Sequence, residues 1–446
     1  MKPIEQTPIG KDILKITSNV KSGVNHVKHK VILHTEKYDI NIPLVESIEI
    51  LSDFNSNTSD YIVASFLMGM GDFIKDIYPY RDNLNLTITR IIGKVKSTYT
   101  YRFVLLNNNG NISGTRYNQS SRDELNKLEQ VRVIGQCVDR ISETLRLQFV
   151  SGIYRDVTVE DMLKSMLLSN IRTAKSVLGN IKIQYHLVKP DNNKVYNHIK
   201  VPTGTNILQL PTYLQNNDYG VYNGNIGTYV KIHEKWNQDK YNTLNNIYVY
   251  PLYDSKIFDN SKRKLIIYGV SSAKFNHVEN TYLQDGDVLS IIAGVGTTSY
   301  DDAENKLMDK GVGFTTSNPE ALLTSNNITN DNSSYVDAES LNQTTLDKDR
   351  KDKLNTTQYI GPDANHFKYR SDIVKNTMMP YTIQWNFCDP DLIYPGMPVM
   401  FVFKDGEHGI VKLKGTVQSL YTLYTEGMNS VSALVNIMVE KPYYRR

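Results

Sequence analysis

Short runs of alternating apolar and polar residues, separated by turn residues, dominate both ends of this chain. In the run 84–90, Leu84, Leu86 and Ile88 alternate with polar residues, which predicts a strand with one buried and one wet face. Strand-like composition is also found at 31–42, 99–106, 131–138, 227–232, 246–251, 264–269, 288–293, 381–387, 399–403, 410–423 and 432–440. Because short strands punctuated by turns are typical of barrels and sandwiches, a mainly β fold is predicted.

One internal segment changes to a helical period. Its apolar residues fall on one side of a helix over 158–171, namely Met162, Leu163, Met166, Leu167 and Ile171. Thr158 is placed to cap this helix, with Asp161 as the acidic member of a start that resembles a capping box. A second short helix is predicted over 207–214. These helices and the strands that follow them predict an α+β unit between two β-rich ends.

The length of 446 residues is too great for one ordinary core, so several domains are expected. The predicted division is a first β-barrel domain at 1–155, a middle α+β domain at 156–293, and a second β-barrel domain at 364–446. Residues 294–363 are rich in Asn, Ser, Thr and Asp, which predicts a polar linker or insertion with one helix near 301–310.

The two β-rich ends of the chain have similar sequences at two points. Residues 76–79 and 392–396 each place a Tyr-Pro pair ahead of a strand. Residues 131–138 and 411–418 each place a glycine after alternating apolar positions, where a bulge or sharp bend is expected. Either the chain carries two related barrels, or short β segments resemble one another by chance.

Charge and cysteine content exclude several classes of protein. The 50 basic and 47 acidic residues give a net charge of +3 and are mixed along the chain, so a dedicated nucleic-acid binder is not expected. Cys137 and Cys388 lie far apart and form no CxxC pair, which argues against a disulfide framework or structural zinc. The first residues lack the apolar core of a signal peptide, and no apolar run approaches the roughly 20 residues of a membrane span. Folding in a cytoplasm is expected.

Tyrosine is the outlier in composition, with 30 Tyr against 12 Phe and 2 Trp. Tyrosine favours strands, and it also suits protein–protein contacts because its ring buries area while its hydroxyl stays hydrated. The sequence leaves both interpretations open.

Two histidine patterns were considered as metal sites. His26, His29 and His34 are close in sequence, but in an extended segment His29 points away from the other two, so exposed polar histidines are the favoured interpretation. His233 begins an HExxH-like stretch, but Asn237 stands where the second histidine is required. No metal site is predicted at either place.

Motifs for phosphate binding and nucleophilic catalysis are also incomplete. The loop that begins at Gly294 follows a strand but has no P-loop lysine, and Ser299 replaces the third glycine of GxGxxG. Residues 269–273 start like a GxSxG elbow and end in Ala273. Both stretches are interpreted as ordinary chain turns.

Tyrosines beside basic residues could stack nucleic-acid bases. They occur at Tyr99, Tyr101 and Arg102, and in the tail 443–446. Because no RNP-type or OB-fold pattern accompanies them, they are interpreted as strand faces and a basic tail. The sequence therefore assigns no catalytic, cofactor-binding or metal-binding residue, and an enzyme is not expected.

Several segments together resemble the baseplate hub proteins of contractile-tailed phages, which are similar to the hub part of type VI secretion spike proteins. The segments are 76–90, 158–168, 201–207, 219–253, 394–399 and 415–417. They follow in order over most of the chain, and each is short.

The resemblance implies two tube-type β-barrel domains flanking the middle α+β domain. It further implies a homotrimer whose pseudo-sixfold ring adapts the hexameric tail tube to the threefold central spike and gives a passage for DNA. The implied partners are the tail tube protein and the central spike protein, with tape measure and baseplate wedge proteins as further candidates. No cofactor, no specific nucleic-acid binding and no membrane contact are implied, and the expected location is the virion tail, assembled in the host cytoplasm.

Two alternatives stay open at this point. One is another tail component, such as a tube-terminating or peripheral baseplate protein built on the same barrel. The other is a tail-associated cell-wall hydrolase, for which no converging acid or nucleophile was found in the sequence.

Overall fold

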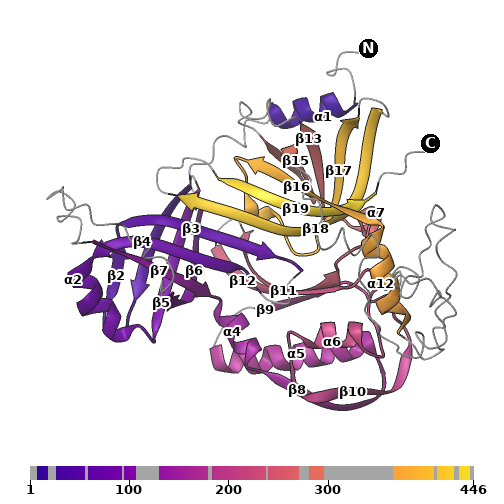
Figure 1. Ribbon diagram of the computed structural model, residues 1–446, viewed down its shortest axis with the longest axis horizontal. Coiled ribbons are helices and arrows are strands. Elements are labelled where there is room, and N and C mark those ends of the chain that lie inside the picture. Colours follow the sequence, from indigo (N-terminus) through magenta and orange to yellow (C-terminus); the bar gives the residue numbers. More distant parts are fainter. Residues whose placement is uncertain are drawn as a thin grey trace, which may run out of the picture.

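The computed structural model describes residues 8–18, 27–55, 59–92, 95–106, 130–178, 183–237, 240–270, 281–295, 365–405, 409–425 and 431–441. Within these ranges the chain forms two β-barrels and a middle part that contains the longest helix described (Figure 1). Several predictions lie outside the described residues: the helix near 301–310, the turn at 107–111, the tail 443–446, and nearly all of the segment 294–363.

Barrel 1, at the left of Figure 1, is built from the first part of the chain. Its strands are β1 (Val27–His34), β2 (Asp39–Ile42), β3 (Leu44–Asp53), β4 (Tyr61–Gly69), β5 (Leu84–Ile92), β6 (Val95–Leu105) and β7 (Gln130–Val138). They pair in the order β3-β4-β7-β6-β5-β1-β2. Only Pro43 separates β2 from β3, so the sheet returns on itself. Proline suits this corner because it has no N–H to donate to a ladder.

Barrel 2 takes its strands from the later part of the chain. They are β13 (Lys264–Val270), β15 (Val288–Val295), β16 (Met378–Asn386), β17 (Pro398–Asp405), β18 (Gly409–Thr425) and β19 (Ser432–Glu440). They pair in the order β17-β13-β15-β16-β19-β18, and β18 pairs back to β17, which closes the barrel. The short strand β14 (Tyr282–Asp285) also pairs with β15.

The two barrels share one strand order. If β2 and β3 are counted as one bent strand, each barrel has six strand positions, numbered in chain order. Positions one to six are β1, β2–β3, β4, β5, β6 and β7 in barrel 1, and β13, β15, β16, β17, β18 and β19 in barrel 2. Around both barrels, neighbouring strands follow the order 1-2-3-6-5-4. The direction of the first strand differs: β1 is antiparallel to β2 and β5, whereas β13 is parallel to β15 and β17. The barrels are therefore topological duplicates with one reversed strand.

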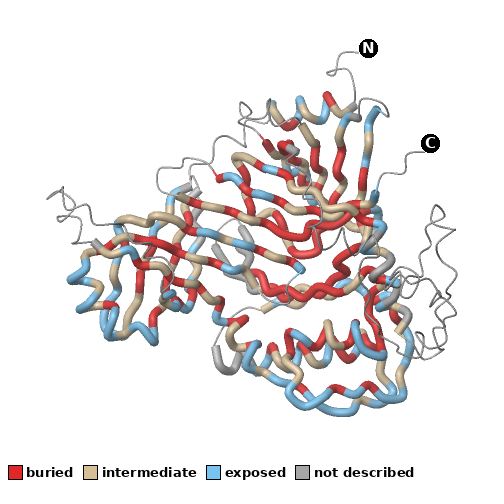
Figure 2. Tube along the Cα trace, in the orientation of Figure 1, coloured by how far each residue is buried: buried red, intermediate tan, exposed pale blue. Residues whose placement is uncertain are grey.

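Both barrels are filled by the inward residues of their strands, which form one continuous apolar cluster. Leu84 and Leu86 of β5 and Val399 and Phe401 of β17 are at most 1% exposed. Figure 2 shows this burial as red stretches along the strands of both barrels. The alternation that the sequence predicted for 84–90 is confirmed, because Asn85, Thr87 and Thr89 are more exposed than the residues that alternate with them.

The middle part packs helices between two small sheets. Its elements are α4 (Arg140–Arg146), β8 (Phe149–Thr158), α5 (Val159–Leu178), β9 (Ile183–Leu187), β10 (Val195–Asn206), α6 (Leu210–Asn216), β11 (Ile226–Asn237), β12 (Lys240–Pro251) and α7 (Ile257–Asn260). β8 pairs with β10, and β11, β12 and β9 form the second sheet. α5 is capped as predicted, because the Asp161 N–H donates to Thr158 Oγ1 at 3.1 Å.

Short helical segments complete the fold. They are α1 (Pro8–Thr17), α2 (Met70–Asp72), η3 (Phe73–Ile77), η4 (Tyr78–Tyr80), α12 (His366–Asn376) and η7 (Pro390–Leu392). α1 precedes barrel 1 in sequence but packs on barrel 2, where Ile16 joins Tyr268, Ile292 and Val402 in a small buried cluster. No helix among the described residues is long and apolar enough to cross a lipid bilayer.

The predicted fold class, mainly β with an α+β insert, is confirmed. The strand membership differs from the sequence prediction in one respect: β13 and most of β15 fall in 156–293, the segment predicted as the middle domain, but pair with strands of barrel 2. The cause is that strand pairing is nonlocal, so an apolar run does not reveal its partner. The division into 1–155, 156–293, 294–363 and 364–446 stays a prediction about independently folding units.

Only one of the two sequence similarities falls at equivalent strand positions of the two barrels. The Tyr-Pro pairs precede β5 and β17, which both occupy position four, and Ile77 and Ile393 just before them are fully buried. The other similarity relates β7, at position six of barrel 1, to β18, at position five of barrel 2, so it does not reflect the duplication. The glycines of this second pair, Gly135 and Gly415, are explained by close packing of their neighbours and not by a bulge. A Cβ at Gly415 would strike the Met438 carbonyl.

Candidate functional site

The main feature that joins distant parts of the chain is a strand-paired junction between the barrels. The second half of β18 in barrel 2 pairs antiparallel with β3 in barrel 1, from Ser419 opposite Asp53 to Thr425 opposite Ser47. This pairing satisfies the backbone edge of β3 and makes one sheet continuous across both barrels. The junction therefore fixes how two like modules sit side by side.

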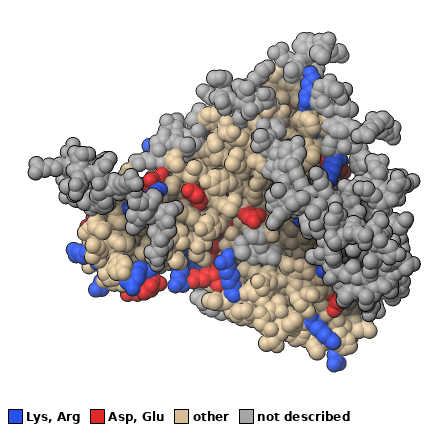
Figure 3. All heavy atoms as spheres, viewed as in Figure 1, with Lys and Arg blue, Asp and Glu red and all other residues tan. Residues whose placement is uncertain are grey.

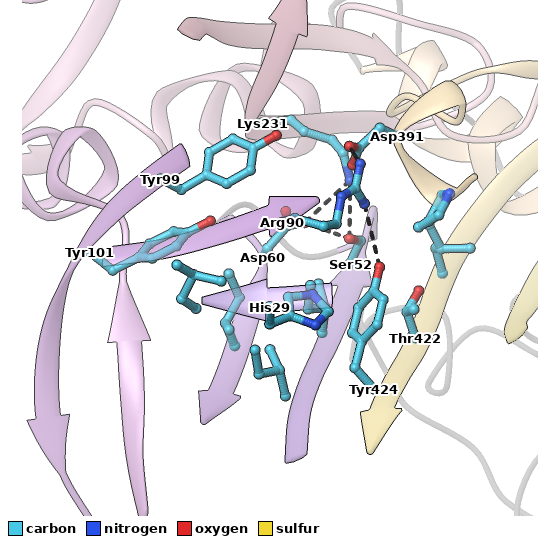
Figure 4. Close-up of a pocket in the computed structure, with 16 residues that line it drawn as sticks. His29, Ser52, Asp60, Arg90, Tyr99, Tyr101, Lys231, Asp391, Thr422 and Tyr424 are labelled. Carbon is cyan, nitrogen blue, oxygen red and sulfur yellow. Dashed lines mark hydrogen bonds and ion pairs between the residues drawn. The ribbon is translucent and has the colours of Figure 1, made fainter. Parts of the chain in front are cut away.

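A buried arginine reinforces this junction. Arg90 follows Leu84, Leu86 and Ile88 on the inner face of β5, and its side chain is 10% exposed. Its guanidinium contacts the Asp391 carboxylate from the connection between β16 and β17. Figure 4 shows Arg90 at the centre of the site, directed at Asp391 and Tyr424.

Two further groups of barrel 2 surround the Arg90 guanidinium. Nη1 donates to the Tyr424 hydroxyl at 3.4 Å, and Nη2 lies 3.8 Å from Asp389 Oδ1. Charge-assisted contacts of this kind are strong where water is excluded. Arg90 thus links barrel 1 to three groups of barrel 2.

Burial and the charges of this cluster shift the pKa values of two ionisable groups in opposite directions. Burial, with the negative charge of Asp391 nearby, raises the pKa of Asp389 to about 6, although Arg90 opposes the shift. Burial and the positive charge of Arg90 lower the pKa of His29 to about 4. His29 is therefore neutral at pH 7 and lies edge-on to the Tyr424 ring, at 4.6 Å between centroids.

A second ion pair connects the middle part to barrel 1. Lys231 of β11 has a side chain that is 5% exposed, and its Nζ lies 3.6 Å from Asp60 Oδ1 and 3.2 Å from Ser52 Oγ. Tyr229 of the same strand donates to Asp60 Oδ1 at 2.8 Å. The same region of barrel 1 is therefore joined to barrel 2 through Arg90 and to the middle part through Asp60.

A small cavity of about 60 Å³ lies between these two ion pairs. It is lined by residues of all three parts, among them Arg90, Tyr99, Lys231 and Thr422. Arg90 Nε and Thr422 Oγ1 are buried and have no hydrogen-bond partner among the described residues. A volume of this size accommodates a few ordered waters, because one water needs roughly 10–15 Å³ measured in this way.

The charged side chains of the site contact one another, since Arg90 pairs with Asp391 and Lys231 pairs with Asp60. Within the described ranges, no group of three His, Cys, Asp or Glu side chains is placed to hold a metal ion. Cys137 and Cys388 are buried, and burial raises the pKa of both thiols. The site is therefore suited to holding three parts of the chain together.

The histidines of the sequence analysis are used locally or lie outside the described residues. His34 bonds to Asp39 at 2.7 Å and to Thr87 at 2.8 Å, and His29 points to the opposite side of β1, into the cavity. The prediction of exposed histidines is wrong for His29, which is half-buried because it lies on the same face of β1 as the buried Val31 and Leu33. His26 is not among the described residues.

The other candidate motifs lie in strands. The stretch that contains His233 and Asn237 is strand β11, which removes the helix that an HExxH site needs. Gly294 is the penultimate residue of β15, and most of its loop lies outside the described residues, as does the stretch 271–273. Tyr101 is buried inside barrel 1, so it is not a surface platform for bases.

Arg90, Asp391, Asp60 and Lys231 were missed by the sequence analysis. A signal was present for Arg90, since it continues the buried alternation of β5 with a charged residue. Such a residue is almost never buried without a partner, and its position alone predicts an oppositely charged contact. Nothing in the sequence indicates that the contact comes from a segment 301 residues away.

Comparison with known proteins gives structural neighbours only. No protein-family model matches the sequence, and no curated protein matches it. One similar structure is an E. coli protein described as a component of the type VI secretion system with similarity to T4 bacteriophage tail proteins. It has a TM-score of 0.41 and 8% identity, over 93% of this chain and 77% of that one.

Two further neighbours are of the same kind. The 43 kDa tail protein of a Shewanella oneidensis prophage has a TM-score of 0.40 and 10% identity, over 92% of this chain and 96% of that one. A chain in a Francisella PdpA–VgrG complex has a TM-score of 0.36 and 10% identity, over 99% of this chain and 65% of that one. The structural neighbours are thus phage tail and type VI secretion proteins, the kinds that the sequence resembles, and the role of this chain is inferred from its own geometry.

Proposed function

We propose that this chain is a structural, non-enzymatic hub subunit of a contractile tail baseplate that works as a homotrimer. One observation carries the proposal: each chain holds two six-stranded barrels of the same strand order, joined side by side through β3 and β18. A chain of this kind offers two similar modules per copy.

Such a junction extends naturally to a ring. The contact is heterologous, because position two of barrel 1 meets position five of barrel 2, and heterologous contacts that repeat by rotation close into rings. Three copies give six barrel positions around a threefold axis. A ring of this kind can match a sixfold tail tube on one side and a threefold spike on the other.

The sheet that spans the junction is suited to line a passage for DNA. Neighbouring residues on its open face are Leu51 opposite Tyr421 and Glu49 opposite Leu423, none of which is basic. On the side of the molecule in Figure 3, Lys and Arg are scattered among Asp and Glu without a large basic patch. Since tight DNA binding needs clustered basic side chains, this surface favours loose passage.

The non-enzymatic role is supported by how the buried charges are used. Arg90, Asp391, Lys231 and Asp60 are engaged in contacts between parts of the chain. The proposed partners are a second and third copy of the chain, the tail tube protein and the central spike protein, with tape measure and wedge proteins as peripheral contacts in the virion tail.

Native mass spectrometry of the purified chain, alone and with its spike protein, tests the proposal. We expect a complex of three chains, with spike protein added in threefold stoichiometry. A chain that stays monomeric in both conditions contradicts the proposal. Six copies per tail particle would instead assign the chain to a tube-terminating or peripheral baseplate position.

A further inference from the structure

The two-stranded ribbon of β8 and β10 carries the most exposed apolar side chains of the described chain. The ribbon forms the lower margin of the molecule in Figure 1, and much of it is exposed in Figure 2. Four large apolar side chains on the ribbon or directly before it exceed all others described in exposure: Leu147 (74%), Phe149 (62%), Ile153 (62%) and Val195 (58%). Exposed apolar groups gathered along one element are typical of a protein–protein contact.

The ribbon is packed on its inner face only. Val150 of β8 and Ile199 and Val201 of β10 are buried in the apolar cluster that includes α5 and α6. Phe149 and Ile153 lie on the opposite face of β8 from Val150, because successive side chains of a strand alternate. The core of the middle part therefore leaves the outer face of the ribbon unused.

β8 also has a free backbone edge at Ile153. The Lys200 N–H donates to the Tyr219 hydroxyl at 2.7 Å, and the Lys200 C=O accepts from the Tyr213 hydroxyl at 2.9 Å, so both groups point away from β8. Opposite residues of an antiparallel pair either exchange both bonds or direct both groups outward. Ile153, which lies opposite Lys200, therefore directs its N–H and C=O away from β10, where no described residue bonds them.

The two edges of the ribbon thus differ. The edge of β10 is covered by tyrosine hydroxyls, whereas the edge of β8 is open at Ile153 and, two residues further on, at Arg155, which lies opposite His198. An open strand edge is a template for another strand, and the main-chain hydrogen bonds of the added strand supply affinity.

The charges of the outer face indicate which strand fits. Arg155 and Lys200 are exposed on this face, and neither forms an ion pair with a described residue. The outward residues of β8 between 149 and 155 include no acidic side chain. Two copies that met edge to edge through β8 would bring basic side chains together. A lipid surface would leave the backbone edge without partners. An acidic protein segment satisfies both the charges and the edge.

We propose that β8 accepts an extended segment of another protein, which adds as a strand at this edge. Its apolar side chains lie beside Phe149 and Ile153, and its carboxylates lie beside Arg155 and Lys200. The inference goes beyond the proposed function, because it assigns a docking edge to the middle part and depends neither on the barrels nor on the ring.

A synthetic strand tests the proposal on the full chain. The probe is the fluorescent, end-capped peptide Glu-Thr-Val-Thr-Val-Thr-Glu, which places apolar and acidic side chains on one face of a strand. We expect binding, measured by fluorescence anisotropy, that weakens as salt is added. Hydrogen exchange of the Ile153 amide should slow in the complex, because its N–H gains a partner. The same peptide with a backbone methylated at alternate nitrogens should bind about tenfold more weakly or worse, since it cannot complete the ladder.

Charge reversal tests the position of the site. The double variant Arg155→Glu/Lys200→Glu should bind the acidic peptide about tenfold more weakly or worse, and should instead prefer the peptide in which lysine replaces glutamate. Lys75→Glu, a reversal at an exposed position of barrel 1, is the matched control and should leave binding unchanged. Circular dichroism verifies that each variant is folded.

Three results would overturn the inference. One is equal binding of the acidic, basic and methylated peptides, and another is no binding of any of them. The third is self-association, or binding to phosphatidylserine vesicles, that the double variant loses while the acidic peptide does not bind, because the surface would then belong to a second copy or to a membrane. Native mass spectrometry reports on the hub proposal separately. A chain that is monomeric with and without spike protein but binds the acidic peptide contradicts the hub proposal and leaves this inference standing.

Discussion

Arg90 continues the buried alternation of β5 after Leu84, Leu86 and Ile88. Its side chain meets Asp391, Tyr424 and Asp389, which all belong to barrel 2. A buried pair of charges contributes little net stability compared with apolar packing, but removing one partner leaves the other uncompensated. Arg90 therefore specifies how the barrels dock more than it stabilises either of them.

Replacement of Arg90 should destabilise the junction. In Arg90→Met, we expect the free energy of unfolding to fall by about 2–4 kcal/mol, the range for a broken buried ion pair discounted because Asp391 keeps some solvent contact. Urea unfolding followed by circular dichroism measures this change. Arg155→Met, at an exposed position of β8, is the control, and equal losses in the two variants would contradict the assigned role.

The stability of the junction should depend on pH through two opposing groups. The pKa of Asp389 is raised from 3.8 to about 6, so the folded chain holds this proton more tightly and rising pH destabilises the fold between about 4 and 6. The pKa of His29 is lowered from 6.5 to about 4, so falling pH destabilises the fold between 6.5 and 4. In the unaltered chain the two effects oppose each other.

Single substitutions should separate these effects. Relative to the unaltered chain, His29→Gln should gain stability as the pH falls from 6.5 to 4, because only the Asp389 effect remains. Asp389→Asn should lose stability over the same interval. Thermal unfolding at a series of pH values measures both, and two variants that run parallel to the unaltered chain would refute the assignment.

At the scale of elements, strand periodicity predicted most of the strands and the start of the long helix. The alternation of β5 and the cap of α5 depend on neighbouring residues, so the sequence contains them. Strand partners depend on distant residues, and the sequence analysis therefore placed β13 and β15 in the middle domain. The candidate site was missed for the same reason, since it joins β5, β11 and the connection before β17.

Glycine at the centre of β18 shows the same dependence on distant neighbours. Gly415 pairs with Val399 on one side and Val439 on the other, and an added Cβ would strike the Met438 carbonyl. We expect Gly415→Ala to lower the free energy of unfolding by about 1–3 kcal/mol, as overpacking does in cores. Gly71→Ala is the matched control, because a Cβ there meets nothing within 4 Å. Equal stability of both variants in urea would contradict the packing account.

At the scale of the whole molecule, the abundance of tyrosine has an explanation that combines both interpretations of the composition. Tyr229, Tyr250 and Tyr424 lie in strands, and each hydroxyl bonds across a boundary between parts of the chain. Tyr248 and Tyr394 stack across another boundary, with centroids 6.1 Å apart. The interfaces that tyrosine serves are thus, in part, internal to the chain.

The near-neutral sheet across the junction predicts weak contact with DNA. We expect no measurable binding of a short DNA duplex at physiological salt, because few counterions would be released from the duplex. Fluorescence anisotropy with a labelled duplex measures this, and a salt-dependent affinity in the micromolar range or tighter would contradict a passage for free sliding.

The central claim is that the two barrels of one chain are equivalent modules of a single ring. Single-particle electron microscopy of the purified oligomer tests it most directly. The account predicts averaged views along the axis with six barrel-sized lobes around an open centre and threefold symmetry imposed by the middle parts. Particles with three lobes, with no central opening, or with one chain each would contradict it.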